Sequence, residues 1–224
     1  MCDMVKVIDN LVSDFYKEDL QNAIFSSEFA WVHYDQTAGG FNKNFSWVED
    51  SNTEETSLLT HKPSRNLKDE IVSFDPLLYK VAELVGYRIH LLRVKVNLML
   101  PLKKINPTSY NRPHIDHPTP NAKTLLYYVN DCDGDTVLFD KTYTGEDPGE
   151  LKVIHRFTPK AGSAILFDSN RYHASSTPTL GKRSAINIIF LPYEDRLGNQ
   201  EHSILPPLPS SFSSKEEIKE FFKL

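Results

Sequence analysis

Cysteine is nearly absent from this chain of 224 residues, which contains only Cys2 and Cys132. Two thiols cannot build the several disulfides of a small secreted scaffold, and they cannot supply the four ligands of a cysteine-rich zinc site. Sparse cysteine is typical of proteins that work in a reducing compartment. We therefore expect a cytoplasmic protein whose fold depends on a hydrophobic core.

Long apolar runs are also missing, because no segment approaches the roughly 20 apolar residues that a transmembrane helix needs. The opening "MCDMVKVIDN" lacks the basic start and the apolar stretch of a secretory signal peptide. The net charge of -5 provides no overall positive field that would attract nucleic acid or anionic lipid. These absences favour a soluble protein with no membrane partner, and nucleic acid is not an expected partner.

The composition that remains is that of an ordinary globular protein. Hydrophobic residues make up 40% of the chain, which is enough for one sizeable core and excludes global disorder. We expect a single domain over residues 1–200. The remaining residues, 201–224, begin with the proline-rich "LPPLPSS" and end in "SSKEEIKEFFKL", which predicts a linker followed by an amphipathic helix.

Two helices are expected in the first part of the domain, residues 13–86. Ser13 can cap a helix through "DFYKEDLQNAIF", and "DPLLYKVAELVG" places Pro76 at a helix start and Gly86 at its end. The opening "VKVIDNLV" (5–12) alternates as a strand does. From Trp31 to Asn66 both periodicities fail, so we expect long loops with a short strand at most, and residues 39–66 are the expected specificity element.

Short strands dominate the second part, from about residue 87 to residue 194. "YRIHLLRVKVNLML" alternates, and short apolar runs follow at "TLLYYVN", "TVLFD", "LKVIHRF", "SAILFD" and "SAINIIFLP". Turn-forming residues such as Asp133-Gly134 separate them. Many short strands with this spacing predict a β-sandwich, jelly roll or barrel.

Metal-ligand chemistry is first indicated by "NRPHIDHPTP". On an extended strand His114 and Asp116 point to the same face, whereas the adjacent His117 points to the other. This pair is weak evidence alone, but His173 follows the strand "SAILF" and offers a third ligand. Two histidines and one carboxylate form the facial triad of non-haem Fe(II) oxygenases, which leaves open positions for substrates.

Arg183 begins the last long strand, ten residues after His173. A guanidinium is always charged and presents a planar fork, so it can hold a carboxylate close to the metal. Alternation places Ala185, Asn187 and Ile189 on the same inner face as Arg183. The residues therefore predict a metal site with a carboxylate-binding group beside it.

At this point the chain resembles the Fe(II)- and 2-oxoglutarate-dependent oxygenases, and within them the prolyl 4-hydroxylase-like branch. The resemblance rests on the ordered series "HID", "LLYYVN", "TVLFD", "FTPKAGSAILFD", "YHASSTP" and "GKRSAINIIF", and it covers Val5 to Glu194. It implies a mainly β fold with flanking helices, namely a double-stranded β-helix, which is a distorted, cupin-like jelly roll.

The resemblance also implies roles for individual residues. His114, Asp116 and His173 match the iron ligands, and they are the expected catalytic centre. Arg183 and Tyr128 match the groups that hold the distal carboxylate of 2-oxoglutarate, while Leu126 and Asn187 are expected to line the cosubstrate pocket. Two points stay open. The neighbouring Lys182 could replace Arg183 by a one-residue shift, and Asp133-Gly134-Asp135 stands where family members often have paired glycines.

The activity implied by the resemblance is that of a dioxygenase. It would use Fe(II), 2-oxoglutarate and O2, with ascorbate as a candidate reductant, to hydroxylate a substrate and release succinate and CO2. The expected substrate is a peptidyl proline or another protein residue. Free amino acids, small metabolites and nucleobases are the alternatives within the same chemistry, and a noncatalytic jelly-roll binding module is the alternative outside it.

The residues around the motif are basic, and they include Lys103, Lys104, Arg112, Lys123 and Arg171. They predict a locally positive site mouth that attracts 2-oxoglutarate or an acidic substrate, although solvated lysines on a surface are an equal alternative. The sequence predicts neither the exact substrate nor the stereochemistry nor the oligomeric state.

Overall fold

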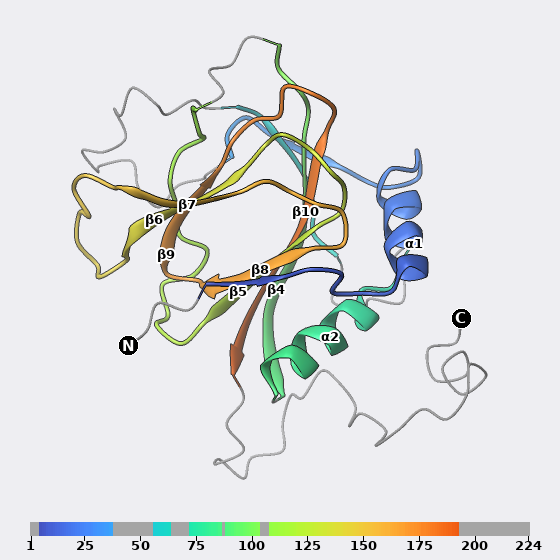
Figure 1. The fold of residues 1–224 in the computed structure, drawn as a ribbon, viewed down its shortest axis with the longest axis horizontal. Coiled ribbons are helices and arrows are strands. Elements are labelled where there is room, and N and C mark those ends of the chain that lie inside the picture. The colour runs from blue at the N-terminus through green and yellow to red at the C-terminus, as the bar shows by residue number, and fades with distance from the viewer. Residues whose placement is uncertain (1–4, 38–55, 64–71, 87, 104–107, 193–224) are drawn as a thin grey trace. The chain divides into compact units, whose positions relative to one another are not determined.

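The structure, a computed structural model, describes residues 5–37, 56–63, 72–86, 88–103 and 108–192 (Figure 1). Two helices and ten strands occur in these ranges. In chain order they are β1 (Lys6–Ile8), α1 (Asp14–Ile24), β2 (Val32–Tyr34), β3 (Leu58–His61), α2 (Asp75–Val85), β4 (Ile89–Met99), β5 (Lys123–Tyr128), β6 (Thr136–Thr142), β7 (Val153–Phe157), β8 (Ala164–Asp168), β9 (Arg171–Ser175) and β10 (Arg183–Pro192).

The strands form two antiparallel sheets. The larger sheet has the order β1-β8-β5-β10-β4-β3-β2, and the smaller one has the order β7-β6-β9. A β-bridge between His114 and His173 attaches the segment that carries His114 to β9 at the edge of the smaller sheet. The mainly β architecture predicted from the sequence is confirmed, and the predicted metal ligands lie where an irregular segment joins a regular strand.

One hydrophobic cluster fills the space between the two sheets. It combines Leu138 of β6 with residues of the larger sheet, namely Leu126, Tyr128, Ile165, Phe167 and Ala185. Val137 and Phe139, the neighbours of Leu138, belong to a second cluster with Tyr172 of β9. Because alternate side chains of a strand face opposite ways, β6 contributes to the two clusters with its two faces.

The two helices begin and end as the sequence predicts. Ser13 caps α1 by accepting a hydrogen bond from the Tyr16 amide (3.3 Å), and Gly86 ends α2 with a φ of 74° that favours glycine. Figure 1 shows both helices beside the larger sheet, on the side away from β6, β7 and β9. Gln21 donates to the carbonyl of Val129 at 2.7 Å, which fixes α1 to the end of β5. Within the described part of the chain, no helix has the length and apolar character to cross a membrane.

Two expectations are corrected. The first strand covers Lys6–Ile8 rather than 5–12, and it ends before Asn10, whose φ of 50° is incompatible with a regular strand. Between Trp31 and Asn66 there are two short strands, β2 and β3, because β3 pairs with the inner strand β4 through a contact that local periodicity does not reveal. Most of residues 39–66, and all of 201–224, lie outside the described residues.

Candidate functional site

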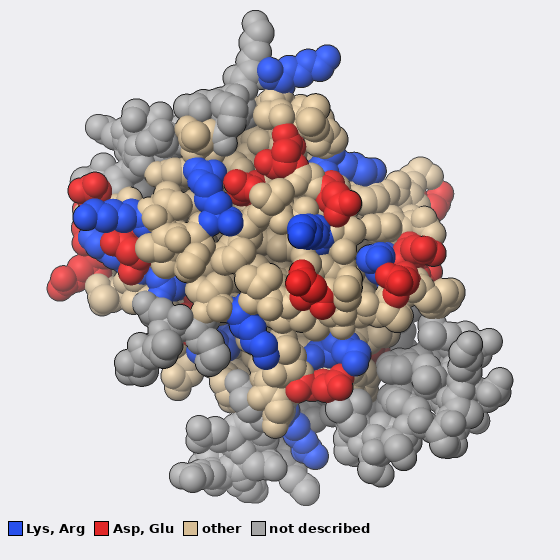
Figure 2. All heavy atoms as spheres, in the orientation of Figure 1, with Lys and Arg blue, Asp and Glu red and all other residues tan. Residues whose placement is uncertain are grey.

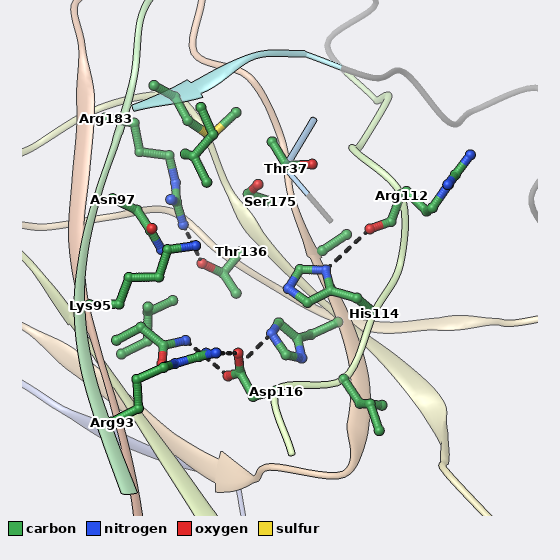
Figure 3. A pocket seen from close by; sticks show the side chains of 17 residues that line it. Thr37, Arg93, Lys95, Asn97, Arg112, His114, Asp116, Thr136, Ser175 and Arg183 are labelled. Atoms are coloured by element: carbon green, nitrogen blue, oxygen red, sulfur yellow. Dashed lines mark hydrogen bonds and ion pairs between the residues drawn. The ribbon is translucent and has the colours of Figure 1, made fainter. Parts of the chain in front are cut away.

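A pocket of about 270 Å³ lies between the two sheets (Figure 3). Its walls come from β4, β5 and β10 of the larger sheet, from β6 and β9 of the smaller sheet, and from the segment around residues 112–116. Its lining includes four of the residues that the sequence predicted as iron ligands or as the carboxylate anchor, namely His114, Asp116, His173 and Arg183. Segments that are distant in sequence therefore meet in one cavity.

His114, Asp116 and His173 are close enough to share one metal ion. One potential ligand atom from each residue lies within 4.8 Å of the others. The backbone amide of each histidine donates a hydrogen bond of 2.9 Å to the backbone carbonyl of the other. The two imidazoles are therefore held side by side, with ring centroids 4.4 Å apart. The spacing of the rings is thus set by the backbone.

The second nitrogen of each imidazole contacts the backbone. Nδ1 of His114 lies 3.2 Å from the carbonyl oxygen of Arg112, and Nδ1 of His173 lies 3.0 Å from that of Arg171. A carbonyl oxygen only accepts, so Nδ1 carries the proton and Nε2 keeps the lone pair that a metal requires. Burial, followed by the neighbouring His173, lowers the pKa of His114 to about 3, which keeps that ring neutral.

Asp116 is held by three side chains from the larger sheet. Arg93 donates to Oδ1 at 3.0 Å, while Thr124 and Asn187 each donate to Oδ2 at 2.9 Å. Burial alone would raise the pKa of this carboxyl, but the neighbouring His173 and Arg93 and the hydrogen bond from Asn187 hold the pKa at about 2. Asp116 is therefore an ionised carboxylate with a fixed orientation. Together with His114 and His173 it matches the donor set of an Fe(II) site.

Arg183 occupies another part of the pocket wall and is 4% exposed. Its Nη2 donates to the hydroxyl of Thr136 at 2.8 Å, and the hydroxyl of Tyr128 donates to the same oxygen at 2.9 Å. A threonine hydroxyl has two acceptor lone pairs and one proton. With both lone pairs engaged, Thr136 can offer its proton, together with the guanidinium, to an anion in the pocket.

Gly134 leaves the space that Arg183 fills. A Cβ at this position would lie 2.8 Å from the carbonyl oxygen of Ser176 and 3.0 Å from Cδ of Arg183. The carbonyl of Gly134 accepts from Nε of Arg183 at 2.8 Å, and Asp133 accepts from the amides of Thr179 and Leu180. The Asp-Gly-Asp turn thus has one required glycine, because of close approach rather than a special φ.

The other predicted pocket residues differ in position. Leu126 and Asn187 line the pocket, but Asn187 contacts Asp116 rather than the Arg183 end. Tyr128 lies behind Thr136 and is 1% exposed; burial raises its pKa to about 12, so the hydroxyl remains a donor. Lys182, the alternative to Arg183, lies over the ring of Phe25 with Nζ 3.5 Å from the centroid.

His117 does not line the pocket. Its Nδ1 accepts from the amide of Thr119 at 3.3 Å, and it is not part of the potential metal cluster. Sequence reasoning missed four residues that shape the site: Arg93, Lys95, Thr124 and Thr136. The only signal for the first two was the alternation in "RVKVNLM", whose polar side chains would normally be assigned to solvent.

The residues of the predicted basic patch differ in position. Arg112 lines the pocket, whereas Lys123 and Arg171 have partners elsewhere. Lys104 lies outside the described residues. Lys123 forms an ion pair with Asp168, and buried Arg171 donates to the carbonyl of Phe139 at 2.8 Å. Figure 3 shows the guanidinium of Arg112 turned away from the ring of His114, while Arg93 and Lys95 extend into the pocket from β4. On the face seen in Figure 2, acidic and basic side chains of the described residues are intermixed.

No protein-family model and no curated protein matches the sequence. Solved structures do match. The epimerase SnoN in complex with Fe3+, alpha ketoglutarate and nogalamycin RO is 12% identical with a TM-score of 0.54, and the match covers 92% of this chain and 89% of that one.

Two further solved structures are similar. A prolyl hydroxylase from Trichoplax adhaerens, in complex with a hypoxia inducible factor peptide fragment, is 18% identical with a TM-score of 0.53 and coverage of 85% of this chain and 84% of that one. An oxidoreductase of the 2OG-Fe(II) oxygenase family from Burkholderia pseudomallei is 12% identical with a TM-score of 0.52 and coverage of 85% and 86%. At these identities the likeness establishes the fold, which is the double-stranded β-helix predicted from the sequence.

Proposed function

We propose that this chain is an Fe(II)- and 2-oxoglutarate-dependent dioxygenase that hydroxylates an organic substrate and releases succinate and CO2. One observation carries the proposal. Two imidazoles and an ionised carboxylate converge in a pocket that also contains a buried arginine with a hydroxyl beside it. The fold shared with oxygenases of this class supports the same conclusion.

The chemistry of the donor set fits Fe(II). His114 and His173 would each contribute Nε2, and Asp116 would contribute one oxygen while Arg93, Thr124 and Asn187 fix its orientation. Three protein ligands leave positions open, whereas a structural zinc site would be closed by a fourth ligand. Bound iron, with its cosubstrate, supplies the oxidising chemistry that the side chains cannot perform.

The protein contributes binding and orientation. Arg183 and Thr136, which are both buried, would hold the distal carboxylate of 2-oxoglutarate through a charge-assisted and a neutral hydrogen bond. Tyr128 would act through Thr136, since its own hydroxyl donates to the hydroxyl of that residue. Leu126, on β5, would pack against the carbon chain of the cosubstrate and exclude water from it.

The substrate proposal is less specific than the chemistry. A peptidyl proline or another protein residue is the leading candidate, supported by the branch resemblance of the sequence and by the likeness to a prolyl hydroxylase seen with a peptide. A small molecule is the second candidate, because SnoN, seen with nogalamycin RO, matches with a similar score. Free amino acids and nucleobases belong to the same second group.

The experiment that tests the proposal couples two readouts. Purified protein with Fe(II), 2-oxoglutarate, ascorbate and O2 is incubated with peptide and metabolite pools, and succinate release is measured together with a mass gain of one oxygen in a pool component. His173→Ala should release no succinate. Equal succinate release by this variant would overturn the proposal and favour a noncatalytic binding module.

A further inference from the structure

The inward face of β4 carries an unusual row of side chains. Arg93, Lys95, Asn97 and Met99 all line the pocket, since alternate residues of a strand share a face. Opposite them on β10, Lys95 pairs in register with Asn187, and Met99 pairs with Arg183. The row therefore runs along the pocket wall from the carboxylate of Asp116 towards Arg183.

Three cationic side chains extend into this pocket, and two of them have partners. Arg93 donates to Asp116 at 3.0 Å, and Arg183 donates to Thr136 and to the carbonyl of Gly134. Lys95 has no hydrogen bond or ion pair with any described residue, although its Nζ lies 5.8 Å from the centroid of the Tyr34 ring. Of the three cations, it is the one without a hydrogen-bond partner among the described residues.

The lowered pKa of the Lys95 ammonium reflects the free-energy cost of holding this charge in the pocket. Burial, followed by the charge of Arg93, lowers the pKa of Lys95 to about 8. A half-buried ammonium without a counter-ion is unfavourable, and an anion bound beside it would remove that penalty. Such a group in a pocket is typical of a ligand-binding position rather than of a core.

The distribution of charges in the pocket indicates that the cosubstrate is not the partner of Lys95. This step depends on the function proposed above, in which the charge of 2-oxoglutarate offsets that of iron, Asp116 is paired with Arg93, and the distal carboxylate is held directly by Arg183. No anion in that scheme is assigned to Lys95. Two further polar atoms of the pocket, Oγ1 of Thr37 and Oδ1 of Asn97, are buried without a hydrogen-bond partner among the described residues, so the wall around Lys95 has unused polar capacity.

We propose that Lys95 anchors an anionic group, a carboxylate or a phosphate, on the organic substrate. The ammonium is a compact point charge on a flexible side chain. It can therefore bind anions that differ in position, whereas the planar fork of an arginine fixes the position of a carboxylate. A peptide substrate would carry an acidic residue next to the modified one, and a small-molecule substrate would itself be an acid. The anchor determines which substrates bind rather than the chemical step.

The test uses the full chain loaded with 2-oxoglutarate and with zinc in place of iron, because zinc has no redox chemistry. Loading is measured first by calorimetry. Acetate and inorganic phosphate are then titrated separately, and binding is followed by calorimetry and by the NMR signal of the Lys95 ammonium. The two probes distinguish a carboxylate anchor from a phosphate anchor by which of them binds more tightly.

Lys95→Met should weaken binding of the preferred probe by about tenfold or more, as expected for a lost charge-assisted hydrogen bond. It should leave 2-oxoglutarate affinity unchanged, and Lys95→Arg should retain probe binding. Lys62→Met is the matched control, since Lys62 lies over the same Tyr34 ring at 5.8 Å but does not line the pocket. It should behave as the wild type does.

Three results would overturn the inference: no binding of either probe to the loaded wild type, equal binding by Lys95→Met, or loss of 2-oxoglutarate affinity in Lys95→Met. The last result would mean that Lys95 belongs to the cosubstrate site. If the wild type does not bind zinc and 2-oxoglutarate in the loading step, the proposed function is rejected, and the role of Lys95 is rejected with it. This failure is distinguishable because loading is measured before the probes are added.

Discussion

His114 and His173 are joined by two backbone hydrogen bonds of 2.9 Å, one in each direction. The pairing brings an irregular segment and a regular strand together at the point where both imidazoles enter the pocket. Because each ring also contacts a backbone carbonyl through Nδ1, the direction of both Nε2 lone pairs is set before any ligand binds. Preorganisation of this kind makes the effect of single substitutions predictable.

Loss of either imidazole should abolish metal binding at useful concentrations. His114→Ala and His173→Ala each remove one of three ligands, and Fe(II)-dependent succinate formation should fall below detection. His117→Ala is the control, since its ring accepts from Thr119 instead. Metal affinity is measured by calorimetry with zinc, and retention of tight binding in either ligand variant would contradict the assigned ligand set.

The Arg183 end of the pocket should control affinity for 2-oxoglutarate. Arg183→Met should raise the dissociation constant by roughly 10- to 100-fold, because it removes a charge-assisted interaction worth about 1.5–3 kcal/mol. Thr136→Val should weaken binding by about tenfold, since it removes one donor and leaves two buried donors unpaired. The affinity is measured with the zinc-loaded protein.

Adjacent tyrosines give an internal comparison for the same site. Tyr128→Phe should weaken 2-oxoglutarate binding several-fold, since it frees a lone pair of Thr136 and changes where that hydroxyl points. Tyr127→Phe should have no effect on binding, because the hydroxyl of Tyr127 is buried without a partner among the described residues. Equal effects of the two variants would contradict the role given to Thr136.

Gly134→Ala should affect both stability and the cosubstrate site. The added methyl meets backbone atoms of Ser176 and Pro178 and the side chain of Arg183, so we expect a loss of about 1–3 kcal/mol in unfolding free energy and weaker 2-oxoglutarate binding. Gly86→Ala should cost about 1 kcal/mol through its φ of 74° and leave 2-oxoglutarate affinity unchanged. Denaturant titration and calorimetry separate the two effects.

Lys95→Met should stabilise the ligand-free protein at neutral pH. The pKa of Lys95 is lowered from 10.5 to about 8, so the penalty of its charge is fully present below about pH 8 and disappears as the pH rises to 10.5. The facing groups are Arg93, Lys62 and Asp116. We expect a gain of roughly 1–3 kcal/mol at pH 7 that vanishes near pH 10.5, measured by denaturant unfolding across that range. A gain in unfolding free energy that persists at pH 10.5 would show that the charge of Lys95 is not its cause.

The sequence predicted the ligand cluster because its signals are local. His114 and Asp116 lie two residues apart, although in an irregular segment rather than on the expected strand. His173 follows a recognisable strand, and Gly86 and Ser13 mark helix boundaries through backbone chemistry. Each of these depends on a few adjacent residues.

The residues that the sequence did not reveal depend on pairing between distant strands. Arg93 and Lys95 alternate with valines, as on any strand that has one solvated face, and only the pairing of β4 with β10 shows that this face is the pocket. Thr136 gains its role from Tyr128 and Arg183, which lie on other strands. Two residues of the predicted basic patch, Lys123 and Arg171, were misassigned for the same reason, since their partners are distant in sequence.

The most direct test of the proposed function is an anaerobic titration of the wild-type protein with Fe(II) and 2-oxoglutarate. We expect a weak visible charge-transfer absorption that needs both components, is lost in His173→Ala and is retained in His117→Ala. Absence of this absorption from the wild type at saturating iron and 2-oxoglutarate would contradict the proposed function.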